Sequence, residues 1–192
     1  MTHSVGKLLL FCGPSGSGKT TIVHHLLQTD PRIKFSVSAT TRAKRFNEVN
    51  GVDYFFISVD EFKSRIEKDE FVEWEQVYPG GYYGTLKKEI EKVWSEGKIP
   101  VFDVDVEGGL KIKSIYGESL LAVFVRPPSV EELHKRLQAR NSETPESYKT
   151  RIAKSEHELS FAFQFDRIIV NDQLEFALKE ARLLVNDFIE KI

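Results

Sequence analysis

Short runs of apolar residues alternate along this chain with longer stretches whose apolar residues recur at helical spacing. The apolar runs predict buried strands at residues 7–12, 35–38, 99–105, 120–125 and 167–170. The helical spacing predicts helices at residues 18–28, 86–96, 131–140, 146–161 and 174–189. Strands that alternate with helices in this way favour an α/β fold built on a parallel sheet with right-handed crossovers.

The segment between residues 34 and 86 follows a different pattern. It begins with a polar stretch, residues 39–50, in which Arg42 and Arg45 suit a loop that contacts a charged group. An apolar run, a helix and a partly alternating run follow at residues 53–57, 59–68 and 71–78. We therefore expect residues 53–83 to form a small β-rich insert.

Composition narrows the class of protein without changing this picture. The 192 residues are 41% hydrophobic and 29% charged, which is ordinary for one globular domain. The formal net charge of −2 lacks the basic footprint of a nucleic-acid binder, so we expect no such partner. No stretch approaches the roughly eighteen apolar residues of a membrane span, and residues 1–6 lack a signal-peptide core, so we expect a cytoplasmic protein. Cys12 is the only cysteine, which excludes an intramolecular disulfide and suggests a buried thiol.

Residues 13–20 read GPSGSGKT, a complete phosphate-binding loop of the form GxxxxGK[ST]. The loop follows a predicted strand and precedes a predicted helix, which is the context that the motif requires. Its backbone N–H groups and the positive end of the helix dipole can bind a polyphosphate. We expect Lys19 to reach the β- and γ-phosphates and Thr20 to contact Mg²⁺, because a purely structural turn leaves this pair unexplained.

Three arginines downstream suit the transfer of a phosphoryl group. Arg136 and Arg140 are four residues apart and share a helix face, and Arg151 lies on the next predicted helix. Guanidinium groups that converge on a phosphate chain stabilise the charge of the moving group. A solvated helix face explains the spacing alone equally well. The phosphate loop favours the first interpretation.

Carboxylates occupy two informative places. Asp103 and Asp105 lie on one face at the carboxyl end of a predicted strand, where parallel sheets bind ligands. They could hold magnesium through water, orient a substrate group or pair with an arginine. Glu73 lies in an apolar stretch, where it faces solvent or pairs with a bound donor. One carboxylate can accept from both N1–H and the 2-amino group of guanine, whereas adenine presents an acceptor at N1.

Several separate motifs occur together in one order: GPSGSGKT, SATTRAKRFNEVNGVDYFF, FVEWEQVYPGGYYGT, FDVDVEGG, RPPSVEELHKRLQAR and IIVND. In this combination the chain resembles the guanylate kinases, which transfer phosphate from ATP to GMP or dGMP. The match covers nearly the whole chain. It implies a phosphate-loop NTPase core at residues 1–33, 87–136 and 156–192, a GMP-binding insert at about 34–86 and a helical lid at about 137–155.

The resemblance also assigns residues. The implied catalytic residues are Lys19, Arg136, Arg140 and Arg151. The implied ATP-binding residues are Gly13, Pro14, Ser15, Gly16, Ser17, Gly18, Lys19, Thr20, Thr21 and Asn171. The implied GMP-binding residues are Ser38, Arg42, Arg45, Glu48, Tyr54, Glu73, Tyr83, Thr85, Asp103 and Asp105. Mg²⁺ would accompany ATP, held by Thr20 and, through water, by Asp103.

Two other functions fit part of the pattern. A kinase for a phosphorylated sugar could share the phosphate loop and lid, but it would have no reason to keep Glu73 with Ser38 and Thr85. A non-catalytic scaffold domain of similar fold generally has a degraded phosphate loop, whereas this chain keeps Lys19 and Thr20. Direct in-line transfer from ATP to GMP therefore remains the leading hypothesis.

Overall fold

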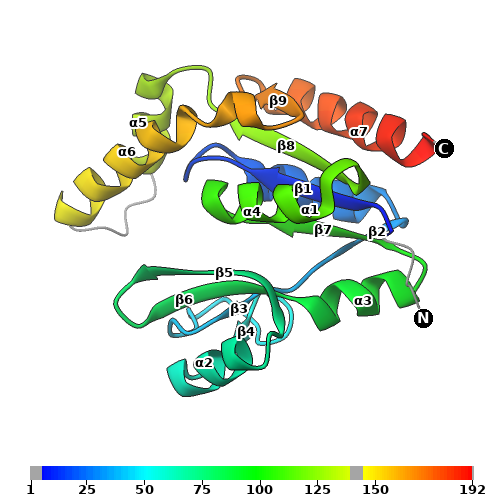
Figure 1. Ribbon diagram of the computed structural model, residues 1–192. Helices are drawn as coiled ribbons and strands as arrows, with labels where there is room; N and C mark the ends of the chain where they lie inside the picture. Colours follow the sequence, from blue (N-terminus) through cyan, green and yellow to red (C-terminus); the bar gives the residue numbers. More distant parts are fainter. Residues whose placement is uncertain (1–5, 139–144, 192) are drawn as a thin grey trace. The chain divides into compact units, whose positions relative to one another are not determined.

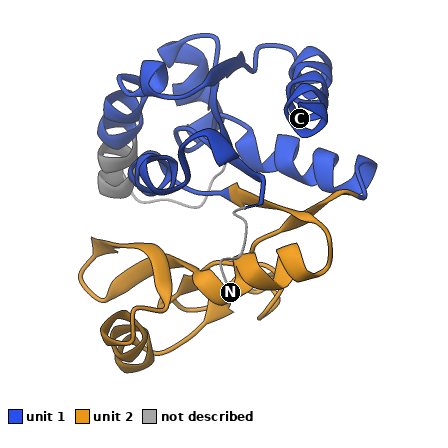
Figure 2. Cartoon of the chain, turned by 45° about the vertical axis from the view of Figure 1, so that its right-hand side comes forward, with its two compact units in different colours: residues 1–31, 103–192 blue, residues 32–102 orange. Residues whose placement is uncertain are grey.

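The computed structural model describes residues 6–138 and 145–191, and for residues 145–151 it describes the backbone alone. The chain divides into two compact units (Figure 2). Unit 1 comprises residues 1–31 and 103–192, and unit 2 comprises residues 32–102. Both units combine helices with parallel strands, which confirms the predicted α/β class.

The sheet of unit 1 places strand β8 between β1 and β9, all parallel. The strands are β1 (Leu8–Cys12), β8 (Leu120–Arg126) and β9 (Arg167–Val170), and Figure 1 shows helices on either side of them. Every residue of β1 is buried, as expected for a parallel strand covered on both faces. Cys12 ends this strand with a free thiol, and burial raises the pKa of that thiol well above its usual value.

The helices of unit 1 are α1 (Lys19–Thr29), α4 (Val106–Tyr116), α5 (Val130–Gln138), α6 (Pro145–Leu159) and α7 (Leu174–Glu190), with short 3₁₀ turns at Gly117–Ser119 and Ala162–Gln164. The sequence pattern did not predict α4. Its glycine pair, Gly108 and Gly109, weakens the helical signal. A Cβ atom on Gly109 would lie 3.3 Å from the Leu10 side chain, so the second glycine lets α4 pack closely on β1.

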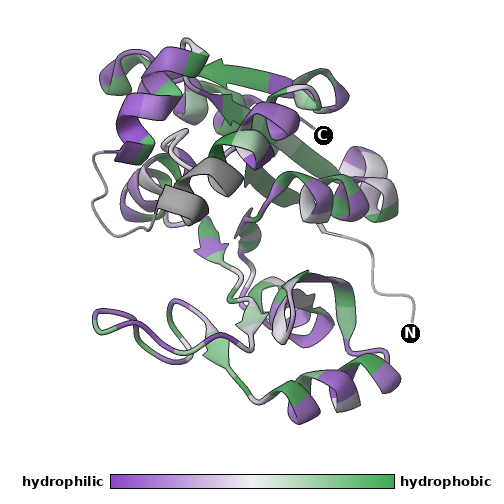
Figure 3. Cartoon of the chain, turned by 90° about the vertical axis from the view of Figure 1, so that its left-hand side faces the viewer, coloured by the Kyte–Doolittle hydropathy of each residue, from purple (hydrophilic) through white to green (hydrophobic). Residues whose placement is uncertain are grey.

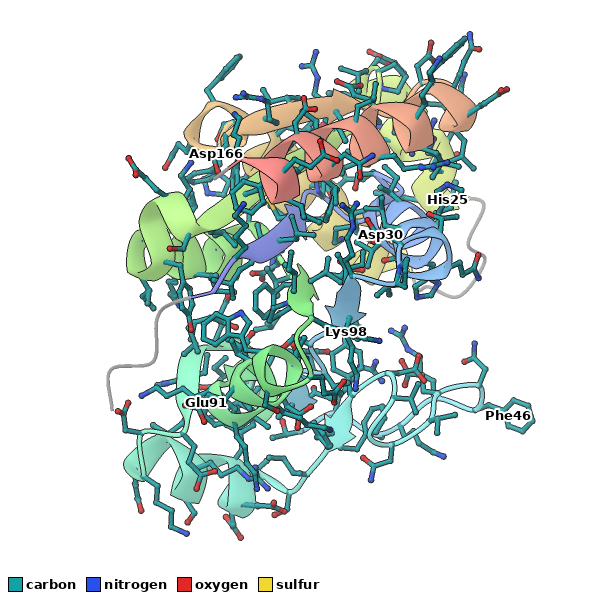
Figure 4. The ribbon with its side chains drawn as sticks, turned by 90° about the vertical axis from the view of Figure 1, so that its right-hand side faces the viewer. His25, Asp30, Phe46, Glu91, Lys98 and Asp166 are labelled. Atoms are coloured by element: carbon teal, nitrogen blue, oxygen red, sulfur yellow. The ribbon has the colours of Figure 1, made fainter. Side chains whose placement is uncertain are left out.

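The α4–β8 region is also tied to the segment before β9. Asp166, which is labelled in Figure 4, accepts a hydrogen bond from the backbone N–H of Ala122 at 2.8 Å. It also forms an ion pair with Lys113 of α4. Among the described residues no helix is long and apolar enough to cross a membrane.

Unit 2 contains a parallel pair and a four-stranded sheet. The parallel pair joins β2 (Ile33–Phe35) to β7 (Ile99–Asp103). The four-stranded sheet has the order β4-β3-β6-β5, with β3 (Ala39–Thr40), β4 (Phe55–Phe56), β5 (Phe71–Tyr78) and β6 (Gly81–Leu86). Its helices are α2 (Val59–Glu67) and α3 (Lys87–Ser95). β2 shares only Phe35 with the strand predicted at residues 35–38, because it begins two residues earlier and ends three residues earlier. The four-stranded sheet accounts for the β-rich pattern of residues 53–83.

An aromatic cluster forms the core of the four-stranded sheet. The Phe62 ring stacks on Phe71 with centroids 4.4 Å apart and lies 5.3 Å from the Tyr82 ring. Ala39 and Leu86 complete the buried cluster. Ser58 caps α2 by accepting a hydrogen bond from the Glu61 backbone, which fixes where this helix begins. Figure 3 shows hydrophobic residues along the strands of unit 1 and hydrophilic residues on the outer faces of its helices.

Candidate functional site

The phosphate loop between β1 and α1 depends on glycines at fixed positions. Gly13, Gly16 and Gly18 have φ angles of 142°, 87° and 93°, a region that favours glycine. A Cβ atom on Gly13 would lie 2.1 Å from the Val125 carbonyl oxygen. One on Gly18 would lie 2.1 Å from the Asn171 side-chain nitrogen. The loop therefore takes a conformation that only glycine permits at these two places.

Asn171 holds the loop from the end of β9. Its side-chain Nδ2 donates to the Ser17 carbonyl at 2.8 Å, and its backbone N–H donates to the Arg126 carbonyl at 2.8 Å. The residue is only 6% exposed, so these bonds are protected from water. Asn171 thus joins β8, β9 and the phosphate loop, while the role in ATP binding that the family resemblance implies for it stays a prediction.

Thr20, Lys19 and Asp103 form one polar group at the start of α1. The Thr20 hydroxyl donates to Asp103 Oδ2 at 2.5 Å, and Lys19 Nζ lies 3.9 Å from Asp103 Oδ1. Hydroxyl and carboxylate oxygens are the ligands that Mg²⁺ prefers, so this pair fits the ion. The described residues contain no cluster of three or more His, Cys, Asp or Glu side chains that could hold a metal. Water and phosphate oxygens would have to complete the coordination.

Asp105 has a structural partner on each carboxylate oxygen. Its Oδ1 accepts from the Gly108 backbone N–H at 2.9 Å and caps α4, and its Oδ2 lies 3.4 Å from Lys154 Nζ on α6. Lys154 also lies 3.8 Å from Glu158, one turn further along the helix. The pairing partner is a lysine, whereas the sequence analysis considered an arginine.

Glu158 is a buried acid that sequence reasoning missed. It is 7% exposed, and burial raises its pKa to about 7, an effect that Lys154 opposes. The only signal in the sequence was its spacing, four residues after Lys154 on a predicted helix. That spacing is common on helix surfaces and does not point to the distant Asp105.

The predicted arginine cluster is described only in part. Arg136 on α5 donates from Nε to Glu132 at 2.9 Å on its own helix. Arg140 lies outside the described residues, and for Arg151 only the backbone in α6 is described. Convergence of the three guanidinium groups on one phosphate chain stays a prediction.

A second predicted set of residues lies together in unit 2, around Arg42. Its two terminal guanidinium nitrogens donate to the two oxygens of Glu48, Nη1 to Oε2 at 2.7 Å and Nη2 to Oε1. The Glu48 carboxylate also accepts from the Arg45 backbone N–H at 2.8 Å, and these bonds, led by that from Arg42, lower its pKa to about 2. Glu48 therefore holds the guanidinium of Arg42 and the backbone of Arg45 in a loop that also carries the fully exposed Phe46 (Figure 4).

Two tyrosines lie beside Arg42. The guanidinium carbon is 5.1 Å from the Tyr54 ring centroid, within the range of a cation–π contact. The Tyr54 and Tyr83 rings meet edge to face with centroids 6.1 Å apart. Guanidinium and phenol groups of this kind can jointly bind an anion such as a phosphate.

The β5–β6 hairpin brings Glu73 and Thr85 together. The two residues pair across the strands, and the Thr85 hydroxyl donates to Glu73 Oε1 at 2.7 Å. Thr85 is fully buried and Glu73 is 8% exposed. Ser38 is half-buried just before β3, and its carbonyl accepts from the Phe55 N–H at 2.9 Å. A buried carboxylate held in this way suits recognition of a neutral ligand with adjacent donors.

Comparison with known proteins gives the family. The sequence model of the guanylate kinase family matches residues 5–190. The chain is 51% identical to the guanylate kinase of Bacteroides thetaiotaomicron, over 97% of this chain and 91% of that protein. It is 48% identical to that of Porphyromonas gingivalis, over 88% and 90% of the two chains. The crystal structure of guanylate kinase from Anaplasma phagocytophilum superposes with a TM-score of 0.76 at 28% identity, covering 98% of this chain and 89% of that one. This chain therefore belongs to the guanylate kinase family.

Proposed function

We propose that this enzyme transfers the γ-phosphate of ATP directly to GMP and dGMP. The observation that carries the choice of nucleotide is the buried Glu73 carboxylate, held by the Thr85 hydroxyl. Guanine can donate to this carboxylate from N1–H and the 2-amino group. Adenine has an acceptor at N1, so a bound AMP would leave a buried charge without its hydrogen bonds, which is a costly mismatch.

The ATP side of the reaction belongs to the phosphate loop. Residues 13–21 would surround the phosphates with backbone N–H groups, and Lys19 would contact the β- and γ-phosphates. Thr20 and Asp103 would hold Mg²⁺, Asp103 through water. An ion held by these residues would help to neutralise the charge that develops on the transferred phosphate.

The GMP side belongs to the residues of unit 2. Arg42, Arg45, Tyr54 and Tyr83 would bind the GMP phosphate, and Ser38, Glu73 and Thr85 would bind guanine. The bidentate Arg42–Glu48 pair supports this role, because it holds the guanidinium in one orientation before substrate arrives. Since the GMP phosphate is already anionic near neutral pH, the attack needs no general base.

The remaining assignments follow from this chemistry. Arg136, Arg140 and Arg151 would stabilise the phosphoryl group in transit, and residues 137–155 would act as a lid that excludes water. No covalent enzyme intermediate is required. We place the enzyme in the cytoplasm, where its nucleotide substrates are found, and we expect no nucleic-acid partner for a chain of net charge −2.

A panel of acceptors tests the proposal. ADP formation is measured from ATP and Mg²⁺ with GMP, dGMP, AMP, CMP, UMP and ribose 1,5-bisphosphate in parallel. We expect turnover with GMP and dGMP alone. Turnover with the sugar phosphate would favour the sugar-kinase alternative, and GMP binding without any turnover would favour a binding domain.

The variant Lys19→Ala is the matched test of the phosphoryl-transfer step. Because Lys19 is assigned to the transferred phosphate, we expect this variant to lose turnover mainly in kcat, by about 100-fold or more. Lys7→Ala is a suitable control, since Lys7 donates to carbonyls at the end of α7 instead. An unchanged kcat in Lys19→Ala would contradict the assigned role.

A further inference from the structure

Lys154 links helix α6 to the residues that follow strand β7. Its Nζ lies 3.4 Å from Asp105 Oδ2 and 3.8 Å from Glu158 Oε1, so one ammonium group lies between two carboxylates. Lys154 and Glu158 are one turn apart on the same face of α6, whereas Asp105 directly precedes α4. The contact between Lys154 and Asp105 therefore joins two elements that are distant in the chain.

The burial of Glu158 strengthens this link. Ion pairs between exposed side chains contribute little on their own, because water screens them. The side chains of Lys154 and Asp105 are partly exposed, but Glu158 is buried and needs a nearby cation when it is ionised. Glu158 therefore attracts the Lys154 ammonium away from solvent and keeps it within reach of Asp105.

Asp105 is held at both of its carboxylate oxygens by groups from two different helices. Its Oδ1 accepts from the Gly108 backbone N–H at 2.9 Å at the start of α4, and its Oδ2 faces Lys154 of α6. The last torsion of an aspartate side chain is loosely defined on its own, whereas a partner at each oxygen fixes the plane of the carboxylate. Lys154 therefore removes freedom that the α4 cap alone would leave.

Two residues before Asp105, Asp103 contacts the start of α1. Its Oδ2 accepts from the Thr20 hydroxyl at 2.5 Å, and its Oδ1 lies 3.9 Å from Lys19 Nζ. The Asp103 and Lys19 side chains are both largely buried. Asp103 thus holds the two side chains of the phosphate-binding motif that reach beyond the loop backbone.

The backbone between the two aspartates is attached to the end of β1 by a long hydrogen bond. The Val104 N–H donates to the Phe11 carbonyl at 3.4 Å. The position of residues 103–105 therefore depends also on the side-chain contacts at both ends of this segment. Asp103 makes those contacts with α1, and Asp105 makes them with α4 and α6.

We propose that Lys154 is a positioning residue of the phosphate-loop site. It acts through Asp105, which keeps residues 103–105 in the place where Asp103 meets α1. With Asp103 held there, the Lys19 ammonium is oriented before nucleotide binds, so that less freedom is lost on binding. Lys154 itself makes no contact with the nucleotide in this arrangement. The inference rests on the proposed binding of ATP phosphates by Lys19.

The first test is Lys154→Met, which keeps the length of the side chain and removes its charge. We expect the dissociation constant for ATP to rise about three- to tenfold, measured by calorimetry with EDTA present so that no metal ion takes part. The KM for ATP in the presence of Mg²⁺ should rise by a similar factor. Lys154→Arg keeps the charge and should restore both values to within about twofold of wild type. Lys179→Met, at an exposed position on α7, is the matched control and should leave both values unchanged.

A double variant separates positioning from stability. Lys154→Met leaves the buried Glu158 without its cation, so it should also lower the free energy of unfolding. Adding Glu158→Gln should recover that stability, because no buried acid then lacks a partner. It should not recover the affinity for ATP, because Asp105 still lacks Lys154.

A second double variant tests the route through Asp105. Asp105→Asn can still accept from the Gly108 N–H through its oxygen, but its amide nitrogen cannot accept from Lys154. We therefore expect Asp105→Asn to weaken ATP binding about as much as Lys154→Met does. The two substitutions together should have no greater effect than either alone.

Four results would overturn the inference: an unchanged ATP affinity in Lys154→Met, an affinity in Lys154→Arg as low as in Lys154→Met, recovery of ATP affinity on adding Glu158→Gln, or additive effects of the Lys154 and Asp105 variants. Failure of the proposed function gives a different result. If the wild-type protein does not phosphorylate GMP, the kinase assignment falls, and ATP dissociation constants from calorimetry still test the role of Lys154.

Discussion

At the scale of single residues, the proposed preference for guanine depends on one buried carboxylate, Glu73, which accepts a hydrogen bond from the Thr85 hydroxyl. In the sequence Glu73 was a lone carboxylate in an apolar stretch, for which a solvent-facing position and pairing with a bound donor both remained open; in the structure it is buried. Lys154 and Glu158 were not predicted as site residues, because their interaction with Asp105 joins positions far apart in the chain. Asp105 is 49 residues from Lys154. Residues that belong to one local motif could be predicted. Residues that act through a distant contact could not.

Glu73→Gln tests the base specificity at this scale. The amide can still accept from Thr85, but it presents one acceptor and one donor where guanine requires an acceptor for both of its donors. We expect kcat/KM for GMP to fall roughly 10- to 100-fold, with a smaller change for AMP, so that the preference between them narrows. Parallel initial rates with both nucleotides measure this.

Glu61→Gln is the control for that substitution, since Glu61 pairs with Arg65 on the surface of α2. An undiminished preference for GMP over AMP in Glu73→Gln would remove Glu73 from the guanine site.

Glu158 should make the stability of the nucleotide-free protein depend on pH. Its pKa is about 7 in the folded protein and near 4.5 ordinarily, so between these values the folded protein binds more protons than the unfolded chain. The free energy of unfolding therefore falls as pH rises from about 4.5 to about 7. Glu158→Gln removes this term, so the variant should gain stability relative to wild type, by on the order of 3 kcal/mol between pH 4.5 and 8.

Urea unfolding at pH 5 and pH 8 measures the difference. Glu180→Gln, an exposed position on α7, is the control and should follow the wild-type curve. A constant difference between Glu158→Gln and wild type across this pH range would show that Glu158 has an ordinary pKa.

At the scale of elements, the predicted strands and helices largely correspond to those of the structure, and the differences have physical causes. Helix α4 was missed because Gly108 and Gly109 interrupt its periodic pattern, although they allow its close packing on β1. The β-bulge between Gln76 and Tyr78 of β5 could not be predicted either, because the register depends on the partner strand and not on β5 alone. The phosphate loop was the exception, because its spacing encodes both its conformation and its chemistry.

The phosphate loop allows a matched comparison of two glycines with positive φ. Gly18 and Gly97 have φ angles of 93° and 70°, but only at Gly18 would a Cβ atom clash, 2.1 Å from Asn171 Nδ2. Gly97→Ala should cost about 1 kcal/mol of stability and leave the KM for ATP unchanged. Gly18→Ala should also raise the KM for ATP at least about tenfold, because the loop and Asn171 must move apart.

Thermal unfolding and ATP saturation curves for both variants provide the comparison. Equal effects of the two substitutions on ATP would mean that positive φ alone, and not the contact with Asn171, governs the loop.

At the scale of the whole molecule, the residues assigned to the two substrates fall in different parts of the chain. The guanine and GMP-phosphate residues, apart from the strand-end aspartates, lie in unit 2, and the phosphate loop with Asn171 lies in unit 1. Substitutions in one unit should therefore alter the binding of one nucleotide alone. Calorimetry should find ATP binding by Glu73→Gln and GMP binding by Lys19→Ala within about twofold of wild type. If Glu73→Gln also weakened ATP binding and Lys19→Ala also weakened GMP binding, the two sites would be coupled.

The position of Cys12 gives this enzyme a built-in reporter. The thiol is unique, fully buried and protonated at neutral pH, and it directly precedes the first glycine of the phosphate loop. An alkylating reagent can reach this thiol only when β1 transiently separates from the sheet. The rate of labelling therefore measures how often that opening occurs. Occupancy of the loop by nucleotide should slow that rate in proportion to ligand saturation. Mass spectrometry of Cys12 alkylation can thus determine ligand affinity without any probe being added to the native chain.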